Sequence, residues 1–85
     1  MFIQSALQGE PLAIGNIGKM YELGAGIQQS NVMAYAHYKI AKSKKTRFRE
    51  AIDKKFNSLK SQMTAAQIQA GEQEAKKLMR EYGLK

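Results

Sequence analysis

The side chains that could carry out chemistry are few in this chain, and their spacing does not combine them. His37 is the only histidine, the chain has no cysteine, and no serine–acid arrangement is suggested by the spacing. Nucleophilic catalysis and most metal sites need such combinations. Glu72 and Glu74 are two residues apart in a predicted helix, so their carboxylates point to different faces and form no acid–base pair. The sequence therefore predicts a protein that is not an enzyme and that uses no metal or cofactor.

Glycines at positions 15, 18, 24 and 26 could suggest a loop that cradles phosphate. Such a loop follows a β-strand, and no stretch of this chain alternates β-branched and polar residues as a strand would. Glycine inside a helix is unfavourable by about 1 kcal/mol relative to alanine. We therefore expect Gly15 and Gly18 to let another helix pack closely against them, with a locally weak helix as the alternative.

Positive charge is concentrated in the middle third of the sequence. The net charge is +7, to which residues 1–41 contribute zero, residues 42–63 contribute +6 and residues 64–85 contribute +1. The cations of the middle segment are Lys42, Lys44, Lys45, Arg47, Arg49, Lys54, Lys55 and Lys60. Such a segment is typical of a solvated surface, of a surface that binds an acidic protein, or of one that neutralises nucleic-acid phosphates.

These three interpretations differ in what else they require. Base stacking needs exposed aromatic rings among the cations, but Phe48 and Phe56 fall on a predicted apolar stripe. A solvated basic face is the simplest interpretation, an acidic protein partner comes second, and a nucleic acid bound by the Lys42–Lys60 segment comes third. Tyrosine is common at protein interfaces, and Tyr35 lies off the apolar stripe of its predicted helix, where we expect it to be exposed. The candidate partner contacts of this region are Tyr35, Lys44, Lys45, Arg47 and Arg49.

Helical periodicity accounts for the first half of the chain. Pro11 suits the first turn of a helix, where its missing N–H is not needed. Small or apolar residues then recur at helical spacing: Ala13, Ile17, Met20, Tyr21 and Gly24. The segment Gly24-Ala25-Gly26 should end this helix, because glycine adopts the left-handed conformation of a C-cap. Ser30 is a suitable N-cap for a second helix. The residues on one face of that helix are Ala34, Tyr38 and Ala41.

The second half of the chain predicts two more helices, which makes the fold all-α. Thr46 can cap a helix whose apolar stripe is Phe48, Ile52, Phe56 and Leu59. Thr64 and Gln67 have the spacing of a capping box at the start of the fourth helix. The apolar positions of that helix are Ile68, Ala75, Leu78, Met79 and Tyr82, and Gly83 should end it. Gly71 lies inside this helix, either at a close contact or as a tolerated weak position.

The first hairpin resembles the Sel-one-like repeat, a relative of the tetratricopeptide repeat that forms α-solenoids. The residues that match the repeat in type and spacing are Ala13, Ile17, Gly18, Met20, Tyr21, Gly24, Gly26, Ala34, Tyr38 and Ala41. Ser30 stands where aspartate is usual, Asn31 replaces an aromatic residue, and His37 replaces a large aromatic residue. The resemblance implies that His37 serves packing rather than catalysis.

The resemblance also implies a domain organisation. All 85 residues form one helical-repeat domain, in which residues 1–9 end a preceding repeat, residues 10–43 form one full repeat, and residues 46–83 form a two-helix cap. A repeat cannot bury its apolar face alone. We therefore expect the face formed by Phe2, Ile3 and Leu7 to be covered either by a second copy, giving a homodimer, or by further repeats of a longer protein.

Members of the Sel-one-like family bind other proteins as adaptors, scaffolds or inhibitory binders, often in bacterial envelope, secretion and host-interaction systems. In solenoids of this kind, variable positions of the first helices line the ligand-binding face, which makes Asn16 and Lys19 further candidate contacts. No stretch is long and apolar enough to span a membrane, and no signal peptide is visible. The default localisation is cytoplasmic; a trimmed periplasmic or secreted protein is the alternative.

Overall fold

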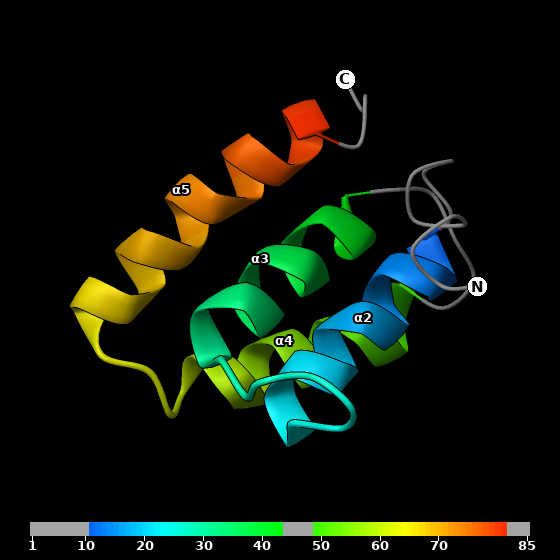
Figure 1. The fold of residues 1–85 in the computed structure, drawn as a ribbon, viewed down its shortest axis with the longest axis horizontal. Coiled ribbons are helices and arrows are strands. Elements are labelled where there is room, and N and C mark those ends of the chain that lie inside the picture. The colour runs from blue at the N-terminus through cyan, green and yellow to red at the C-terminus, as the bar shows by residue number, and fades with distance from the viewer. Residues whose placement is uncertain (1–10, 44–48, 82–85) are drawn as a thin grey trace.

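Four α-helices form the part of the chain that the computed structural model describes, residues 11–43 and 49–81 (Figure 1). They are α2 (Pro11–Leu23), α3 (Asn31–Lys42), α4 (Arg49–Lys60) and α5 (Ala65–Glu81). These residues contain no strand, so the all-α prediction is confirmed. None of these helices is long and apolar enough to cross a membrane. Several predictions concern residues outside the described part: Phe2, Ile3, Leu7, Lys44, Lys45, Thr46, Arg47, Phe48, Tyr82 and Gly83.

The predicted helix ends are formed by local hydrogen bonds. Gly24 and Gly26 have φ angles of 69° and 75°, and the Ala25 N–H donates to the Met20 carbonyl oxygen at 3.0 Å, as in a Schellman C-cap. The Ser30 hydroxyl oxygen accepts from the Met33 N–H at 3.2 Å. The Gln67 N–H donates to Thr64 Oγ1 at 3.1 Å, and the Thr64 N–H donates to Gln67 Oε1 at 3.0 Å. The predicted C-cap, N-cap and capping box are all confirmed.

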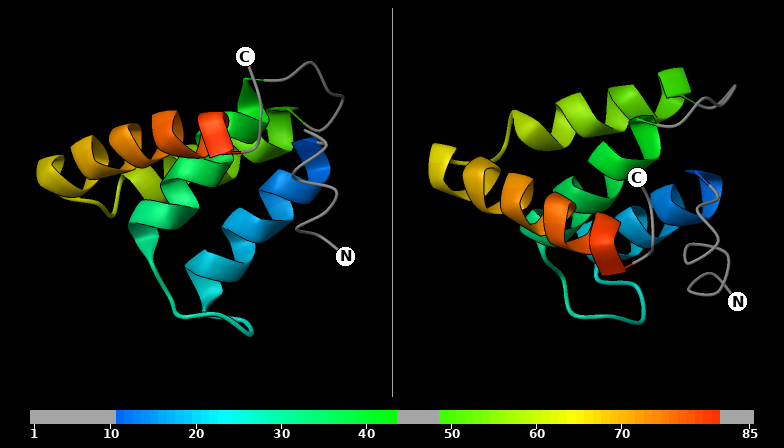
Figure 2. Two further views of the ribbon diagram at one scale, coloured as in Figure 1. Left: turned by 45° about the horizontal axis from the view of Figure 1, so that its top comes forward. Right: turned by 90° about the horizontal axis from the view of Figure 1, so that it is seen from above.

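Helix α3 is the centre of the fold. Helices α2, α4 and α5 each pack extensively on α3, and α4 and α5 make no comparably extensive contact with each other (Figure 2). Helices α2 and α4 run antiparallel to α3, whereas α5 runs parallel to it (Figure 1). The buried residues of α3 lie on all its sides: Ala34, Tyr35, Ala36, His37, Tyr38, Ile40 and Ala41. The sequence predicted only one buried face, because small residues such as Ala36 carry little periodic signal.

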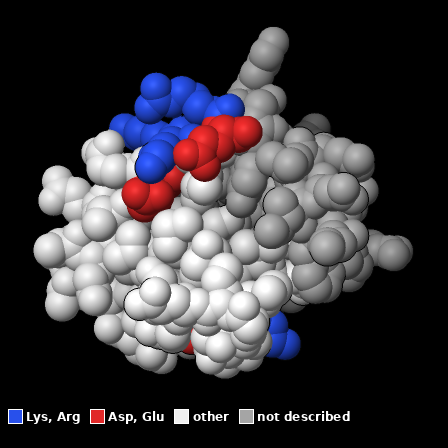
Figure 3. Space-filling view, in the orientation of Figure 1, with Lys and Arg blue, Asp and Glu red and all other residues white. Residues whose placement is uncertain are grey.

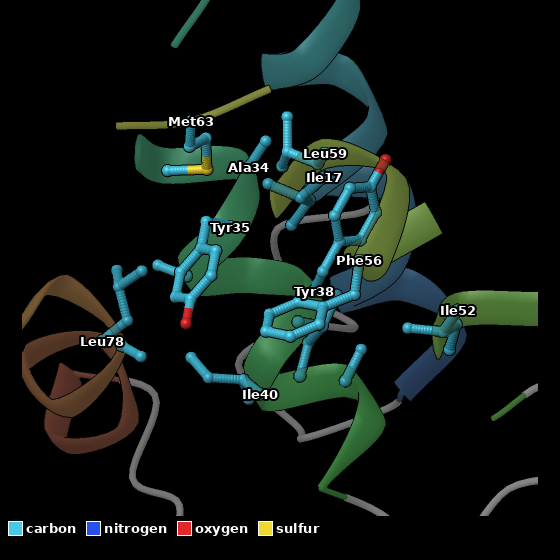
Figure 4. Packing of buried hydrophobic residues seen from close by; sticks show 14 residues of the cluster. Ile17, Ala34, Tyr35, Tyr38, Ile40, Ile52, Phe56, Leu59, Met63 and Leu78 are labelled. Carbon is cyan, nitrogen blue, oxygen red and sulfur yellow. The ribbon is translucent and has the colours of Figure 1, made fainter. Parts of the chain in front are cut away.

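The core forms where these helices meet (Figure 4). The predicted stripe of α4 is confirmed at Ile52, Phe56 and Leu59, which are buried. In α5 the buried predicted residues are Ala75 and Leu78, with Ile68 and Met79 half-buried against the core. The predicted stripe of α2 omitted Ile14, which is completely buried. Ile14 belongs to the same core cluster as Ile17.

Two of the helical glycines lie at close helix contacts. A Cβ atom at Gly18 would lie 2.9 Å from Cδ1 of Tyr38, and one at Gly71 would overlap the Tyr35 ring. Close packing is therefore confirmed at Gly18, and Gly71 marks a close contact rather than a weak position. A Cβ atom at Gly15 would make only ordinary contacts, the nearest with Cδ1 of Ile52 at 3.7 Å. The close-packing prediction is wrong for Gly15.

Candidate functional site

An open groove of about 570 Å³ lies between α4 and α5, with α3 along its floor. We call it the α4–α5 groove. Its lining residues are Tyr35, Lys39, Lys42, Ser43, Arg49, Phe56, Lys60, Ile68 and Glu72. The groove exists because α4 and α5 pack on two sides of α3 instead of on each other. Four of its lining residues are cations and one is a carboxylate.

Helical spacing places the cations along the groove. Arg49 and Lys60 are 11 residues apart, which is close to three helical turns, so they lie on the same flank of α4 with Phe56 between them. Lys39 and Lys42 follow Tyr35 by four and seven residues, which puts them on the same side of α3 as Tyr35. The groove therefore has one row of cations on α3 and another on α4.

Lys39 is paired across the groove with Glu72 of α5. Its ammonium donates to both carboxylate oxygens, at 2.6 Å and 2.7 Å, and the Tyr35 hydroxyl donates to Glu72 Oε2. The hydrogen bond from Lys39, followed by that from Tyr35, holds the pKa of Glu72 below its usual value. Burial, reinforced by the bond to Glu72, raises the pKa of Tyr35 to about 12. This cluster links α3 to α5.

Lys42 is paired on the other side of the groove with Asp53 of α4. Its Nζ lies 2.7 Å from Asp53 Oδ1 and 4.4 Å from the centre of the Phe56 ring. The hydrogen bond from Lys42 lowers the pKa of Asp53, and the charge of Arg49 acts in the same direction. This pair links α3 to α4 and adds a cation–π contact. Lys42 is therefore already engaged by one carboxylate and one aromatic ring.

Arg49 and Lys60 remain as the cations that can receive a ligand. Both are exposed, and neither forms an ion pair with another described residue. With Asp53 included, four cations face two carboxylates, so the groove has a net charge of +2. By contrast, cations and carboxylates intermingle on the surface of α5 (Figure 3). The excess positive charge in this region lies on the α4 side of the groove.

The structure corrects the prediction that Tyr35 is exposed. Tyr35 is 2% exposed, because its ring packs on Phe56 at a centroid distance of 4.7 Å and against the backbone of Gly71. The sequence suggested exposure because Tyr35 lies off the stripe of Ala34 and Tyr38. That stripe faces α2, whereas Tyr35 faces α4 and α5. Of the candidate contacts, Arg49 lines the groove, while Lys44, Lys45 and Arg47 lie outside the described residues.

Asn16 and Lys19 lie at a different place, a small pocket of about 120 Å³ between α2 and α4. The pocket also involves the ring of Tyr38 and, from α4, the side chains of Ile52 and Lys55. Asn16 is half-buried and Lys19 is exposed. The two predicted contacts are therefore together, but the structure does not bring them to the α4–α5 groove.

His37 is a packing residue, as the sequence predicted. It is 1% exposed, its ring stacks on Tyr21 with centroids 5.4 Å apart, and its Nδ1 lies 2.8 Å from the Met33 carbonyl oxygen. Because a carbonyl only accepts, Nδ1 carries the proton and donates. Burial lowers the pKa of His37. In residues 11–43 and 49–81, no three His, Cys, Asp or Glu side chains are grouped so that they could hold a metal ion.

Sequence reasoning missed Lys39, Glu72 and Asp53 as parts of the site. Lys39 could have been found from its position one helical turn after Tyr35. Glu72 directly follows Gly71, the glycine that lets α5 approach Tyr35. Neither signal says which helices meet, so the pairing itself could not be read from spacing.

Comparison of the chain with protein-family models, with curated proteins and with solved structures finds no match.

Proposed function

We propose that this chain is a protein–protein interaction module of the Sel-one-like repeat type, without catalytic activity, that holds an acidic segment of a partner protein in the α4–α5 groove. The observation that carries this proposal is the groove itself, in which Arg49 and Lys60 form no ion pair with a described residue and lie near the side chains of Phe56 and Ile68. Protein interfaces usually have an apolar centre surrounded by a polar rim. Such a module would serve as an adaptor, a scaffold or a regulatory binder.

The packing of α2 on α3 supports the repeat assignment within this proposal. The two helices are antiparallel, and the ring of Tyr38 lies against Gly18 at a distance that no larger residue would allow. Burial of Ala13, Ile17 and Ala34 fits their assignment as repeat-defining positions. The family pattern places small and aromatic residues at these same positions.

An acidic protein fits the groove better than a nucleic acid, which is the alternative ligand of the Lys42–Lys60 segment. Stacking on bases needs open aromatic faces, but Tyr35 and Phe56 are 2% and 5% exposed. Phosphate binding needs several available cations, but Lys39 and Lys42 are already paired with carboxylates. Among the described residues that line the groove, the two remaining cations, Arg49 and Lys60, suit a ligand with few, discrete charges.

The proposal is tested by titrating the chain with a fluorescently labelled hexaglutamate peptide at low and moderate salt. We expect binding that weakens with salt, and that weakens roughly tenfold or more in the double variant Arg49→Glu/Lys60→Glu. The matched control is Lys54→Glu/Lys55→Glu, which makes the same charge change on the same helix outside the groove. An absence of binding, or equal losses in both double variants, would contradict the proposal.

A labelled single-stranded oligonucleotide is titrated in parallel under the same conditions. We expect it to bind more weakly than the peptide and to be affected equally by the two double variants. Tighter binding of the oligonucleotide, lost only in Arg49→Glu/Lys60→Glu, would replace the acidic protein with a nucleic acid as the ligand of the groove.

A further inference from the structure

We infer that the α4–α5 groove selects its ligand by spacing: an extended segment with an acidic residue, an apolar residue two positions later, and a second acidic residue two positions after that. This inference rests on the proposed function and adds the pattern of the partner segment. It follows from the positions of Arg49 and Lys60, from the apolar residues between them, and from the two ion pairs that occupy the remaining cations.

The separation of the available cations sets the separation of the two acidic residues. Eleven residues of helix at 1.5 Å each place Arg49 and Lys60 about 16 Å apart along α4. In an extended chain, residues i and i+4 point to the same side and are about 13 Å apart. The flexible arginine and lysine side chains can span the remaining 3 Å or so. Adjacent acidic residues would reach only one of the two cations.

The middle of the groove favours an apolar residue over a third carboxylate. Phe56 lies between the two available cations on α4, and Ile68 faces the groove from α5 and is half-buried. Lys42, whose ammonium lies over the Phe56 ring, already binds Asp53, and Lys39 already binds Glu72. A third carboxylate would be repelled by the negative charge of Glu72, whereas an apolar side chain would pack on Ile68 and shield it from water. Position i+2 of the segment points to the same side as i and i+4.

The experiment compares three peptides of identical composition, capped at both ends so that they carry no terminal charge. Their central sequences are Asp-Ser-Leu-Ser-Asp, Ser-Asp-Asp-Leu-Ser and Leu-Asp-Ser-Ser-Asp, each embedded in the same serine–glycine flanks. Affinities are measured by competition with the labelled hexaglutamate peptide. We expect the first peptide to bind roughly fivefold or more tightly than the other two.

Variants of the chain test the apolar position separately. Ile68→Ser should remove most of the advantage of the first peptide, whereas the control Leu23→Ser, at an apolar residue that is 64% exposed and outside the groove, should leave it intact. Equal affinities for all three peptides, each lost in Arg49→Glu/Lys60→Glu, would overturn the spacing inference and leave the proposed function standing. If no peptide binds, or if binding does not depend on Arg49 and Lys60, both the spacing inference and the proposed function are contradicted.

Discussion

The backbone of Gly71 lies directly against the aromatic ring of Tyr35, so that a single added methyl group would overlap Cδ1 of that ring. Tyr35 cannot move aside easily. Its ring is buried against Phe56, and its hydroxyl donates to Glu72. This contact sets how closely α5 approaches α3, and therefore helps to set the shape of the α4–α5 groove.

Replacing Gly71 by alanine should destabilise the chain, although alanine favours the helix by about 1 kcal/mol. Overpacking at a rigid contact typically costs about 1–3 kcal/mol, which outweighs the gain in helix propensity. We expect a lower urea midpoint for Gly71→Ala, measured by circular dichroism. A midpoint equal to or above that of the parent chain would show that α5 can shift away from Tyr35 at little cost.

Gly15→Ala should have the opposite effect and serves as the matched comparison. A methyl group at Gly15 would make ordinary contacts with Ile52 and Ala41, at 3.7–3.9 Å. The substitution should therefore keep most of the helix-propensity gain and stabilise the chain by up to about 1 kcal/mol. Urea unfolding of the two alanine variants side by side checks this sign difference. Destabilisation by Gly15→Ala would mean that α2 and α4 pack more tightly than the structure shows.

Ser30→Ala should lower the free energy of unfolding by about 1 kcal/mol, because the Met33 N–H would lose its side-chain acceptor at the start of α3. The effect matters more here than at a peripheral helix, since α3 contacts all the other described helices. Ser30→Asp should restore most of the loss, because aspartate caps equally well. Thermal unfolding of the parent chain, Ser30→Ala and Ser30→Asp measures the loss of stability and its recovery. No recovery in Ser30→Asp would indicate that the hydroxyl has another role.

Stability should fall as the pH drops below about 6.5, and His37 is the reason. Burial lowers the pKa of His37 in the folded chain, while in the unfolded chain it stays near 6.5. The unfolded chain therefore binds more protons below pH 6.5, and the stabilisation present above this pH is progressively lost. The hydrogen bond to the Met33 carbonyl oxygen and, to a smaller extent, the nearby carboxylate of Glu74 oppose this effect, so the decline should be partial.

His37→Phe keeps an aromatic ring beside Tyr21 and removes the titrating group. The fall in urea midpoint between pH 7.5 and pH 5.5 should be smaller in this variant than in the parent chain. Comparing the change with pH within each chain cancels any constant effect of the substitution. An identical pH dependence in both chains would assign the decline to other groups.

The sequence predicted the helices and their ends well because these depend on local chemistry. The capping hydrogen bonds from Ala25 to Met20, from Met33 to Ser30 and between Thr64 and Gln67 join residues at most five positions apart. Ile14 and Tyr35 were misjudged because their burial depends on which helix lies alongside. A single periodic stripe predicts one buried face, whereas α3 is covered on all sides.

The candidate site could be predicted only in part, for the same physical reason. The charge of the Lys42–Lys60 segment and the position of Arg49 are visible in the sequence. The groove itself arises because α4 and α5 pack on different sides of α3, and the pairing of Lys39 with Glu72 spans 33 positions. Contacts of that separation follow from the tertiary arrangement and have no spacing signal in the chain.

Glu72→Gln should tighten the binding of acidic peptides while changing stability little. Glutamine keeps an oxygen that can accept from the Tyr35 hydroxyl, but it frees Lys39 and raises the net charge of the groove by one. Because the Lys39 and Glu72 side chains are 42% and 35% exposed, losing their ion pair should cost no more than about 1 kcal/mol. We expect a several-fold lower Kd for the hexaglutamate peptide at low salt, measured by fluorescence anisotropy.

The matched control is Glu81→Gln, which makes the same charge change at an exposed position of α5 outside the groove. If both variants bind the peptide equally well, the gain comes from net charge alone, and Lys39 has no specific part in it.

The stability of Glu72→Gln should also respond less to acid. The lowered pKa of Glu72 gives the parent chain stability that is present above pH 4.5 and is lost as the pH falls further. A glutamine cannot be protonated in this range, so the difference in stability between the two chains should shrink below pH 4.5. A difference that stays constant with pH would show that Glu72 does not interact with Lys39 and Tyr35 as a carboxylate.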